Sequence, residues 1–402
     1  MTSLDDLLAA MEFRLSWEHN GIRHTDGRYA QRVNFWRDIL PPGLCEAAAR
    51  RPGAGKVDIE LDAGALLPAF KESNVHRVPL DAVETRRVSE VEIMPRLGRF
   101  YPRGILSGVP GVFRESVQPF RCVSLDRDVL TADLNHPLAG RRPGLEVWLH
   151  ALRPKFEEYG GTTVDWLELA ADGPGVQARA GDTPTDFFAD EAFARQDDSD
   201  DGRFYERPRM VQHLDAAARG AIGRLYAELL RPGADVLDLM GSWVSHLPDT
   251  LPVGSLTVLG MNREELAVNP RATERVIHDL NRDPRLPLPA DRYDAVICTA
   301  SVEYLVRPFE VFAEAARVLK PGGVLAATFS NRWFPPKVIR VWPLLHEFER
   351  MGMILEYFLK TGQYTRLETF SLRGLPRPEE DKYFGRIPDA DPVYAVWGYR
   401  VD

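Results

Sequence analysis

The segment Ala234-Asp-Val-Leu-Asp-Leu-Met-Gly-Ser-Trp-Val-Ser-His-Leu-Pro248 decides the fold of this 402-residue chain. Its apolar run Val236-Leu237 is typical of a parallel strand that is buried on both faces. Asp238 stands at the carboxyl end of that strand, where open α/β sheets bind ligands. Gly241 and Ser242 let the backbone approach a ligand closely before a helix begins. The segment therefore predicts the first strand and first loop of a nucleotide-binding α/β domain.

Strands and helices alternate after this segment, which predicts a doubly wound parallel sheet. We expect strands at 255–260, 276–277, 293–299 and 324–329, with helices at 216–230, 263–268 and 308–319. A long amphipathic helix within 338–358 and strands at 366–372 and 392–401 follow. The predicted domain covers residues 204–402.

The order of these segments resembles class I S-adenosylmethionine-dependent methyltransferases of the small-molecule (type 11) kind. The resemblance rests on three motifs, namely Val236-Leu-Asp238, His278-Asp-Leu-Asn281 before Leu286-Pro-Leu-Pro289, and Leu319-Lys-Pro-Gly-Gly323. It implies a Rossmann-like methyltransferase domain, S-adenosylmethionine as cofactor, and a small molecule or an unknown acceptor as substrate. It implies no metal.

The resemblance also assigns the cofactor site. Asp238 would contact the methionine portion, while Asp279 and Leu280 would meet the adenine. Met240, Ser242 and Val244 stand where the family has three glycines, and Gly241 lies between them. Asn262 stands where the family has a carboxylate that accepts both ribose hydroxyls. The other predicted cofactor-binding residues are Tyr205, Asn281, Ala300 and Ser301.

An amide accepts fewer hydroxyl donors than a carboxylate does. A charge-assisted hydrogen bond contributes roughly 1.5 to 3 kcal/mol, against about 1 kcal/mol for a neutral one. We therefore expect Asn262→Asp to tighten cofactor binding by up to about tenfold.

Methyl transfer needs in-line positioning of the acceptor more than it needs covalent catalysis, so a fixed catalytic residue is not required. If a base acts, the candidates are His246, Glu303 and Tyr304. Arg332 and Trp333 follow the fifth strand and are the predicted substrate-binding residues. Structural roles remain open for these side chains: Tyr304, Trp243 and Trp333 as packing aromatics, Asp279 as a turn residue, His246 and Arg332 as structural or surface residues.

The N-terminal half has a different pattern of apolar residues. Apolar residues at helical spacing predict two amphipathic helices, at 4–13 and 28–40, within a helical segment 1–51. Period-two alternation at 57–61, 88–93 and 145–149 predicts an antiparallel β-rich domain at 52–156. Asp133-Leu-Asn-His-Pro-Leu-Ala-Gly140 resembles a segment of FKBP-type peptidyl-prolyl isomerases, although it is equally well explained as a turn. Residues 157–203 are predicted to be a linker.

The amino-acid composition limits the class of protein and the compartment that we expect. With 44% hydrophobic and 27% charged residues and a formal net charge of −9, the chain is typical of a soluble protein that does not bind nucleic acid. Three scattered cysteines and the lack of a signal or membrane-spanning segment favour the cytoplasm. The oligomeric state stays open. The alternative function is a non-catalytic, chaperone or prolyl-isomerase-like protein with a degenerate methyltransferase fold.

Overall fold

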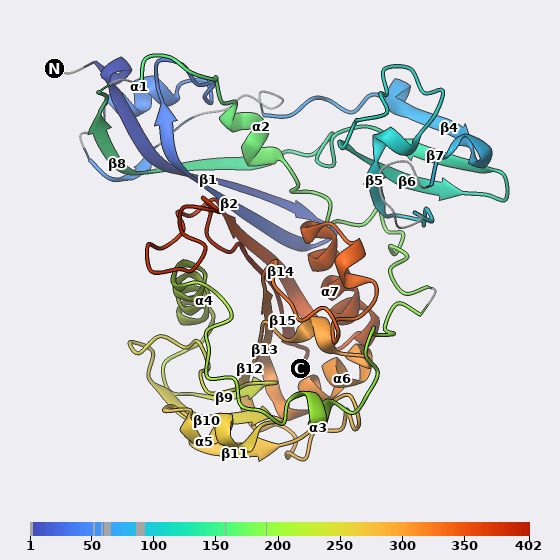
Figure 1. The fold of residues 1–402 in the computed structure, drawn as a ribbon, viewed down its shortest axis with the longest axis vertical. Helices are drawn as coiled ribbons and strands as arrows, with labels where there is room; N and C mark the ends of the chain where they lie inside the picture. The colour runs from blue at the N-terminus through green and yellow to red at the C-terminus, as the bar shows by residue number, and fades with distance from the viewer. Residues whose placement is uncertain are drawn as a thin grey trace.

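The computed structural model describes residues 3–50, 53–57, 59, 66–85, 93–156, 158–189 and 191–402. One sheet of eleven strands runs through the described chain in the order β11-β10-β9-β12-β13-β15-β14-β2-β1-β8-β3 (Figure 1). A second sheet of four strands has the order β4-β7-β6-β5. The N-terminal and C-terminal halves therefore share one continuous sheet.

The C-terminal half forms the predicted doubly wound domain. Its strands are β9 (Ala234–Leu239), β10 (Val253–Gly260), β11 (Glu274–Ile277), β12 (Tyr293–Thr299), β13 (Leu319–Phe329), β14 (Tyr364–Arg373) and β15 (Val393–Arg400). The first five pair in parallel, whereas β15 is antiparallel to both β13 and β14. The strands expected after residue 204 and the helices expected at 216–230, 263–268 and 308–319 are confirmed, because long periodic apolar runs give a strong local sequence signal. The long helix expected within 338–358 begins only at Glu347.

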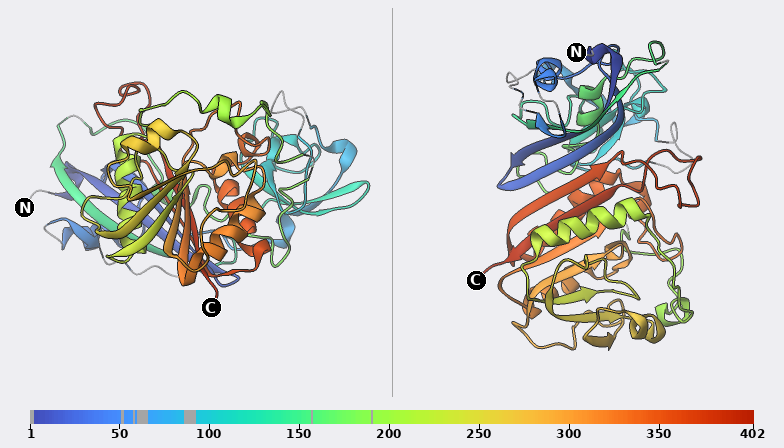
Figure 2. Two further views of the ribbon diagram at one scale, coloured as in Figure 1. Left: turned by 90° about the horizontal axis from the view of Figure 1, so that it is seen from below. Right: turned by 90° about the vertical axis from the view of Figure 1, so that its left-hand side faces the viewer.

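Helices cover both faces of this sheet (Figure 2). Its helices are α4 (Ala216–Leu229), α5 (Arg263–Val268), α6 (Pro308–Val318) and α7 (Glu347–Thr361). Successive strand residues point to opposite faces. In β9, Val236 packs in the core under α4, while Leu237 and Leu239 pack in the core under α6 and α7. Burial on both faces holds the carboxyl ends of the parallel strands in fixed positions.

The two N-terminal helices that we predicted are wrong. Residues 7–34 form a long antiparallel hairpin, β1 (Leu7–His19) and β2 (Ile22–Asn34). Asn20 and Gly21 connect the strands with φ of 51° and 70°, which is the Asn-Gly turn that two-residue hairpins favour. The alternating burial of β1 fits a strand with one face on the core. The Asn-Gly pair was the stronger signal, and the helical spacing was coincidental.

A polar seam joins this hairpin to the C-terminal half, where β2 pairs in parallel with β14. His24 Nδ1 lies 2.8 Å from Thr369 Oγ1, and Ser371 Oγ donates to Asp26 Oδ1 at 2.5 Å. The Arg373 guanidinium donates to both Asp26 oxygens, the closer at 2.7 Å. Buried polar pairs of this kind fix the register, since any slip leaves them unpaired.

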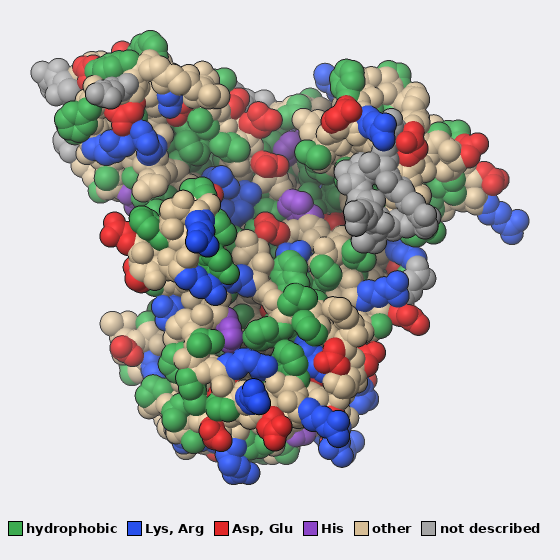
Figure 3. Space-filling view, viewed as in Figure 1, with side chains coloured by type: hydrophobic (Ala, Val, Ile, Leu, Met, Phe, Trp, Pro, Cys, Tyr) green, Lys and Arg blue, Asp and Glu red, His purple; other side chains and the backbone are tan. Residues whose placement is uncertain are grey.

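The remaining elements build two N-terminal lobes, which form the upper left and upper right of Figure 3. The hairpin lobe adds α1 (Leu44–Ala49), β3 (Gly55–Val57), β8 (Gly144–Pro154) and α2 (Trp166–Ala171); the other lobe contains β4 (Val75–Pro79), β5 (Phe100–Pro102), β6 (Pro119–Leu125) and β7 (Val129–Asp133). The strand predicted at 145–149 is confirmed as part of β8, but it joins the eleven-stranded sheet. Residues 58, 60–61 and 88–92 of the other two predicted strands lie outside the described residues.

Candidate functional site

A pocket lies at the carboxyl ends of β9, β10, β11 and β12; it has a cavity volume of about 160 Å³ and is partly open to solvent. Loops after the four strands form its floor, and residues 201–214 cover it. Most of the side chains predicted from the sequence meet here: Tyr205, Asp238, Met240, Gly241, Ser242, His246, Asn262, Asp279, Leu280, Asn281, Ala300, Ser301 and Tyr304. Glu303, Arg332 and Trp333 do not line it. The topology brings these residues together because parallel strands end at one edge of a sheet.

Backbone strain concentrates in this pocket. Met240, His246 and Ala300 have φ of 57°, 54° and 48°, in the left-handed region that side chains disfavour. Each such residue costs on the order of 1 kcal/mol. Met240 keeps this conformation at the position where the resemblance places a glycine. Strain of this kind persists where the surrounding structure enforces it, and it gathers at functional sites.

Two glycines let the first loop lie directly against β10. A Cβ on Gly241 would approach Asp238 Oδ2 to 2.5 Å and Val258 Cγ1 to 2.7 Å. A Cβ on Gly260 would approach the Gly241 carbonyl oxygen to 2.2 Å. Neither position has room for a side chain, so these glycines set the depth of the pocket floor.

Asp238 has an acceptor oxygen that no described residue uses, packed against Gly241 at the floor of the pocket. It is buried at the end of β9, and its Oδ2 has no hydrogen-bond partner among the described residues. Burial raises the pKa of this carboxyl to about 7. An orphaned buried oxygen is costly, and a ligand amino group would satisfy it.

Asp279 offers a second acceptor, at the end of β11. Its Oδ1 accepts from the backbone N–H groups of Asn281, at 2.9 Å, and Arg282, at 3.2 Å. No described residue donates to Oδ2. Leu280 is buried beside it and lines the same pocket. A carboxylate oxygen next to an apolar side chain suits a flat base with an exocyclic amino group.

Asn262 has a structural role that the sequence did not suggest. Its Oδ1 accepts from the N–H groups of Glu264 and Glu265, at 2.9 and 3.0 Å, and so caps α5. Its Nδ2 donates to the carbonyl oxygens of Tyr205 and Glu206, at 2.8 and 2.9 Å. All four hydrogen-bonding capacities of the amide are used. The side chain borders the pocket but has no donor or acceptor left for ribose hydroxyls.

The structure therefore reverses the expected effect of Asn262→Asp. A carboxylate would keep the helix cap but would face two carbonyl oxygens without a donor. We expect the affinity for S-adenosylhomocysteine, measured by calorimetry, to fall about tenfold, because each acceptor left unpaired costs about 1 to 3 kcal/mol. Asn262→Ser, which keeps a cap but adds no charge, should lose less. Tighter binding by Asn262→Asp would contradict this assignment.

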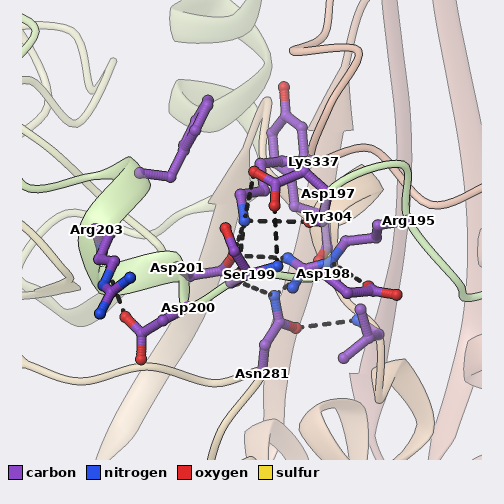
Figure 4. A network of polar contacts seen from close by, with 12 residues as sticks. Arg195, Asp197, Asp198, Ser199, Asp200, Asp201, Arg203, Asn281, Tyr304 and Lys337 are labelled. Atoms are coloured by element: carbon purple, nitrogen blue, oxygen red, sulfur yellow. Dashed lines mark hydrogen bonds and ion pairs between the residues drawn. The ribbon is translucent and has the colours of Figure 1, made fainter.

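A buried ionic network anchors the segment that covers the pocket (Figure 4). Lys337 is fully buried, and its Nζ lies 3.0 Å from Asp201 Oδ1 and 3.2 Å from Asp197 Oδ2. Arg195 Nη1 donates to both Asp201 oxygens at 2.8 Å. Asn281 Nδ2 donates to Asp201 and to the Tyr304 carbonyl oxygen. The acidic run that suggested a linker instead folds around a lysine and leads into α3 (Asp201–Phe204).

The three predicted bases differ in access. His246 lines the pocket, and burial lowers its pKa to about 4, so the imidazole is neutral at pH 7. Tyr304 also lines it, and its hydroxyl oxygen accepts from Phe334 N–H at 2.8 Å. Glu303 is buried outside the pocket, its Oε2 lacks a partner among the described residues, and burial raises its pKa to about 8. Only His246 and Tyr304 have access to a ligand.

Arg332 and Trp333 make other contacts. Arg332 Nε pairs with the buried Asp391 at 2.7 Å, and its guanidinium stacks on the Tyr383 ring at 4.9 Å. The Arg350 guanidinium lies 4.5 Å from the Trp333 ring. Arg332 thus holds the loop before β15, and neither side chain borders the pocket.

Sequence reasoning missed several residues that line the pocket, namely Asp201, Arg209, Gln212, His213, Glu265 and Phe334. Arg209 packs over the rings of Phe204, at 4.6 Å, and Phe334, at 5.4 Å. Glu265 accepts from Arg209 N–H at 2.6 Å and from Ser242 Oγ at 2.5 Å. The mixed aromatic and basic run before α4 was the available signal, but its docking partners lie far away in the chain.

In the part of the chain that the structure describes, no group of His, Cys, Asp or Glu side chains is arranged to hold a metal ion. Nor does any described helix have the length and apolar character needed to cross a membrane.

Comparison with known proteins gives one match to a family model and many matches to solved structures. Residues 241–327 match the model of a methyltransferase domain. A putative methyltransferase from Bacillus halodurans is 14% identical, over 46% of this chain and 100% of its own, with a TM-score of 0.34. A methyltransferase from Thermotoga maritima, described as a possible histamine N-methyltransferase, is 13% identical over 46% and 90% of the two chains, with a TM-score of 0.34. An S-adenosylmethionine-dependent methyltransferase from Aquifex aeolicus is 16% identical over 50% and 97%, with a TM-score of 0.32.

No curated protein matches the chain. None of the matches reported above supports the resemblance of the N-terminal half to peptidyl-prolyl isomerases. The segment Asn135 to Gly140 is a loop, in which Asn135 bonds to both backbone groups of Lys71.

Proposed function

We propose that this chain is an S-adenosylmethionine-dependent methyltransferase that acts on a small molecule. The single observation that carries the proposal is the pair of unused acceptors, Asp238 Oδ2 and Asp279 Oδ2, at two strand ends of one pocket. The two acceptors match the donors of the cofactor, which carries an amino group at one end and the adenine amino group at the other. The methyltransferase-domain match over 241–327 includes the loop after β9 and Asp279.

In this mechanism the cofactor supplies a methyl group bonded to a positively charged sulfur. Asp238 holds the amino end, and Asp279 and Leu280 hold the adenine. The acceptor then lies beside Trp243, His246 and Tyr304, which line the same pocket. Neutral His246 accepts the proton that the acceptor releases. Residues 201–214 cover part of the pocket, so positioning and partial desolvation would supply most of the rate increase.

A second candidate is a binding protein that keeps the fold without the transfer chemistry. It is favoured by Asn262, whose amide is fully occupied, and by Met240 in a glycine position. Fold alone does not separate the two. Under either function we propose a small-molecule partner and a reducing cytoplasm, since Cys45, Cys122 and Cys298 are all free thiols.

Calorimetry with S-adenosylmethionine and S-adenosylhomocysteine tests the proposal. In Asp279→Asn the amide oxygen can still accept from the backbone N–H groups of Asn281 and Arg282. The amide NH₂ group then replaces Oδ2 and places a donor opposite the adenine amino group, which is also a donor. We expect affinity to fall at least tenfold, which corresponds to about 1.4 kcal/mol. Asp283→Asn, at an exposed site in the same loop, is the matched control and should bind normally. If the parent protein binds neither compound at millimolar concentration, the binding-protein alternative replaces the proposal.

A further inference from the structure

Arg209 carries a charge that no described side chain neutralises. It is the only arginine or lysine among the described residues that line the pocket. Its Nη2 donates to the Phe204 carbonyl oxygen at 2.9 Å, but its guanidinium forms no ion pair with a described residue. The neighbouring cations Arg195, Arg332 and Lys337 all pair with carboxylates. Arg209 therefore has donors left for an anion.

The free donors of Arg209 remain accessible. Three rings lie against its guanidinium, namely Phe204 at 4.6 Å, Phe334 at 5.4 Å and Tyr205 at 5.6 Å. A planar guanidinium can stack on rings and still donate from its in-plane N–H groups. Nε and Nη1 bond to no described residue, and neither is among the buried nitrogens that lack a partner. The rings thus hold Arg209 in place while its edge can still meet a carboxylate in two-point contact.

Four carboxylates line the same pocket, and none forms an ion pair with Arg209. Asp201 is neutralised by the buried ionic network described above. Glu265 accepts from the backbone N–H of Arg209 and from a serine hydroxyl. Asp238 and Asp279 are the acceptors proposed for the two amino groups of the cofactor. The guanidinium is therefore left for a second ligand.

The charge of Arg209 acts on the side of the pocket that holds His246. Arg209 and His213 contact the same ring, Phe334, at 5.4 and 5.2 Å. Burial lowers the pKa of His213, and the Arg209 charge lowers it further. Burial first, and then neighbouring positive charges with His213 among them, lower the pKa of His246. Arg209 is not among the charges that shift the pKa of Asp238, so it acts away from the proposed amino end of the cofactor.

An aromatic side chain without a ring partner lies in the same pocket. Trp243 lines it, and its indole makes no hydrogen bond, ring contact or cation contact with a described residue. Its Nε1 is not among the buried nitrogens that lack a partner, so the indole is accessible. Tyr304 and Phe334, in contrast, stack on each other at 6.0 Å. An unpaired indole in a pocket favours a flat ring as its partner.

We propose that the acceptor is a small aromatic carboxylate, with its carboxylate on Arg209 and its ring beside Trp243. This inference rests on the proposed methyltransferase function and narrows its substrate class. The competing anion for Arg209 is the carboxylate of the cofactor itself, and the experiment must separate the two.

Calorimetry of the full chain with para-hydroxybenzoate and para-hydroxybenzamide, in the presence of S-adenosylhomocysteine, tests this proposal. The two probes share a ring and a hydroxyl group, but only the first is an anion. We expect the parent to bind the carboxylate at least about tenfold more tightly than the amide, because charge-assisted hydrogen bonds are the stronger ones. Arg209→Met should remove this preference. Since both probes are compared within one variant, any general effect on the covering segment cancels.

Two further variants complete the test. Arg207→Met is the matched control, since it removes the same charge from an exposed position of the covering segment that does not line the pocket. It should keep the preference of the parent. Trp243→Leu should weaken both probes by a similar factor, up to about tenfold, and should also keep the preference.

The possible failures are distinguishable. A parent that binds S-adenosylhomocysteine but not para-hydroxybenzoate, or that shows no preference for it, overturns this inference and leaves the proposed function intact. So does a preference that survives in Arg209→Met. Weaker S-adenosylhomocysteine binding in Arg209→Met, with no carboxylate preference in the parent, would assign Arg209 to the carboxylate of the cofactor. A parent that binds none of these compounds overturns both proposals.

Discussion

Arg373→Ala is expected to lower the free energy of unfolding by about 3 to 5 kcal/mol, the loss typical of a buried ion pair deprived of one partner. Arg373 donates to both oxygens of Asp26, which is fully buried between β2 and β14. Without the guanidinium, Asp26 keeps only the Ser371 hydroxyl as a side-chain donor. Urea denaturation monitored by tryptophan fluorescence would measure the change.

Arg23→Ala provides the matched control at the same seam. Arg23 pairs with Glu368 at 2.5 Å on the same two strands, but its side chain is 67% exposed. Exposed pairs contribute only about 0 to 1 kcal/mol, so this variant should unfold almost as the parent does. Equal losses in the two variants would show that the seam does not depend on the buried pair. Asp26→Asn combined with Arg373→Met, which removes both charges, should recover part of the loss.

Lys337→Met is the second large effect that we expect. The buried ammonium lies between Asp201 and Asp197 and donates to the carbonyl oxygens of Asp197 and Ser199, at 3.1 and 2.8 Å. Methionine keeps much of the volume but none of the donors. The covering segment should lose about 3 kcal/mol of local stability, and hydrogen exchange of residues 195–209 should report it directly.

The same variant should weaken S-adenosylhomocysteine binding about tenfold, because apparent affinity falls with the fraction of molecules in the competent state. Arg340→Met is the control, since Arg340 pairs with Glu191 at an exposed site of the same region, with side chains 61% and 78% exposed. Faster exchange in Lys337→Met without weaker binding would show that the stability of the covering segment does not affect the affinity for the ligand. Unchanged exchange would refute the anchoring role of Lys337.

The secondary structure of the C-terminal domain could be predicted from the sequence because its hydrophobic patterns are local. Buried parallel strands such as Val236-Leu237 and amphipathic helices such as 308–318 carry their pattern within a few residues. The strand order then placed Asp238 and Asp279 at one edge, as the sequence predicted. The hairpin at 7–34 was readable in principle from Asn20-Gly21, but an apolar spacing that fits both periods misled the interpretation.

By itself the sequence determined the doubly wound domain, the edge at which its pocket lies, and about half of the residues that line it. Only the tertiary structure decided which hydrogen-bonding groups of those side chains remain free for a ligand. Asn262 is used by backbone groups of Tyr205 and Glu206, and Lys337 organises an acidic run that lies some 140 residues earlier in the chain. The pairing of β2 with β14, which places the hairpin in the same sheet, was likewise decided only by the tertiary structure. The physical reason is that hydrogen-bonding capacity is finite, and partners distant in sequence consume it before any ligand does.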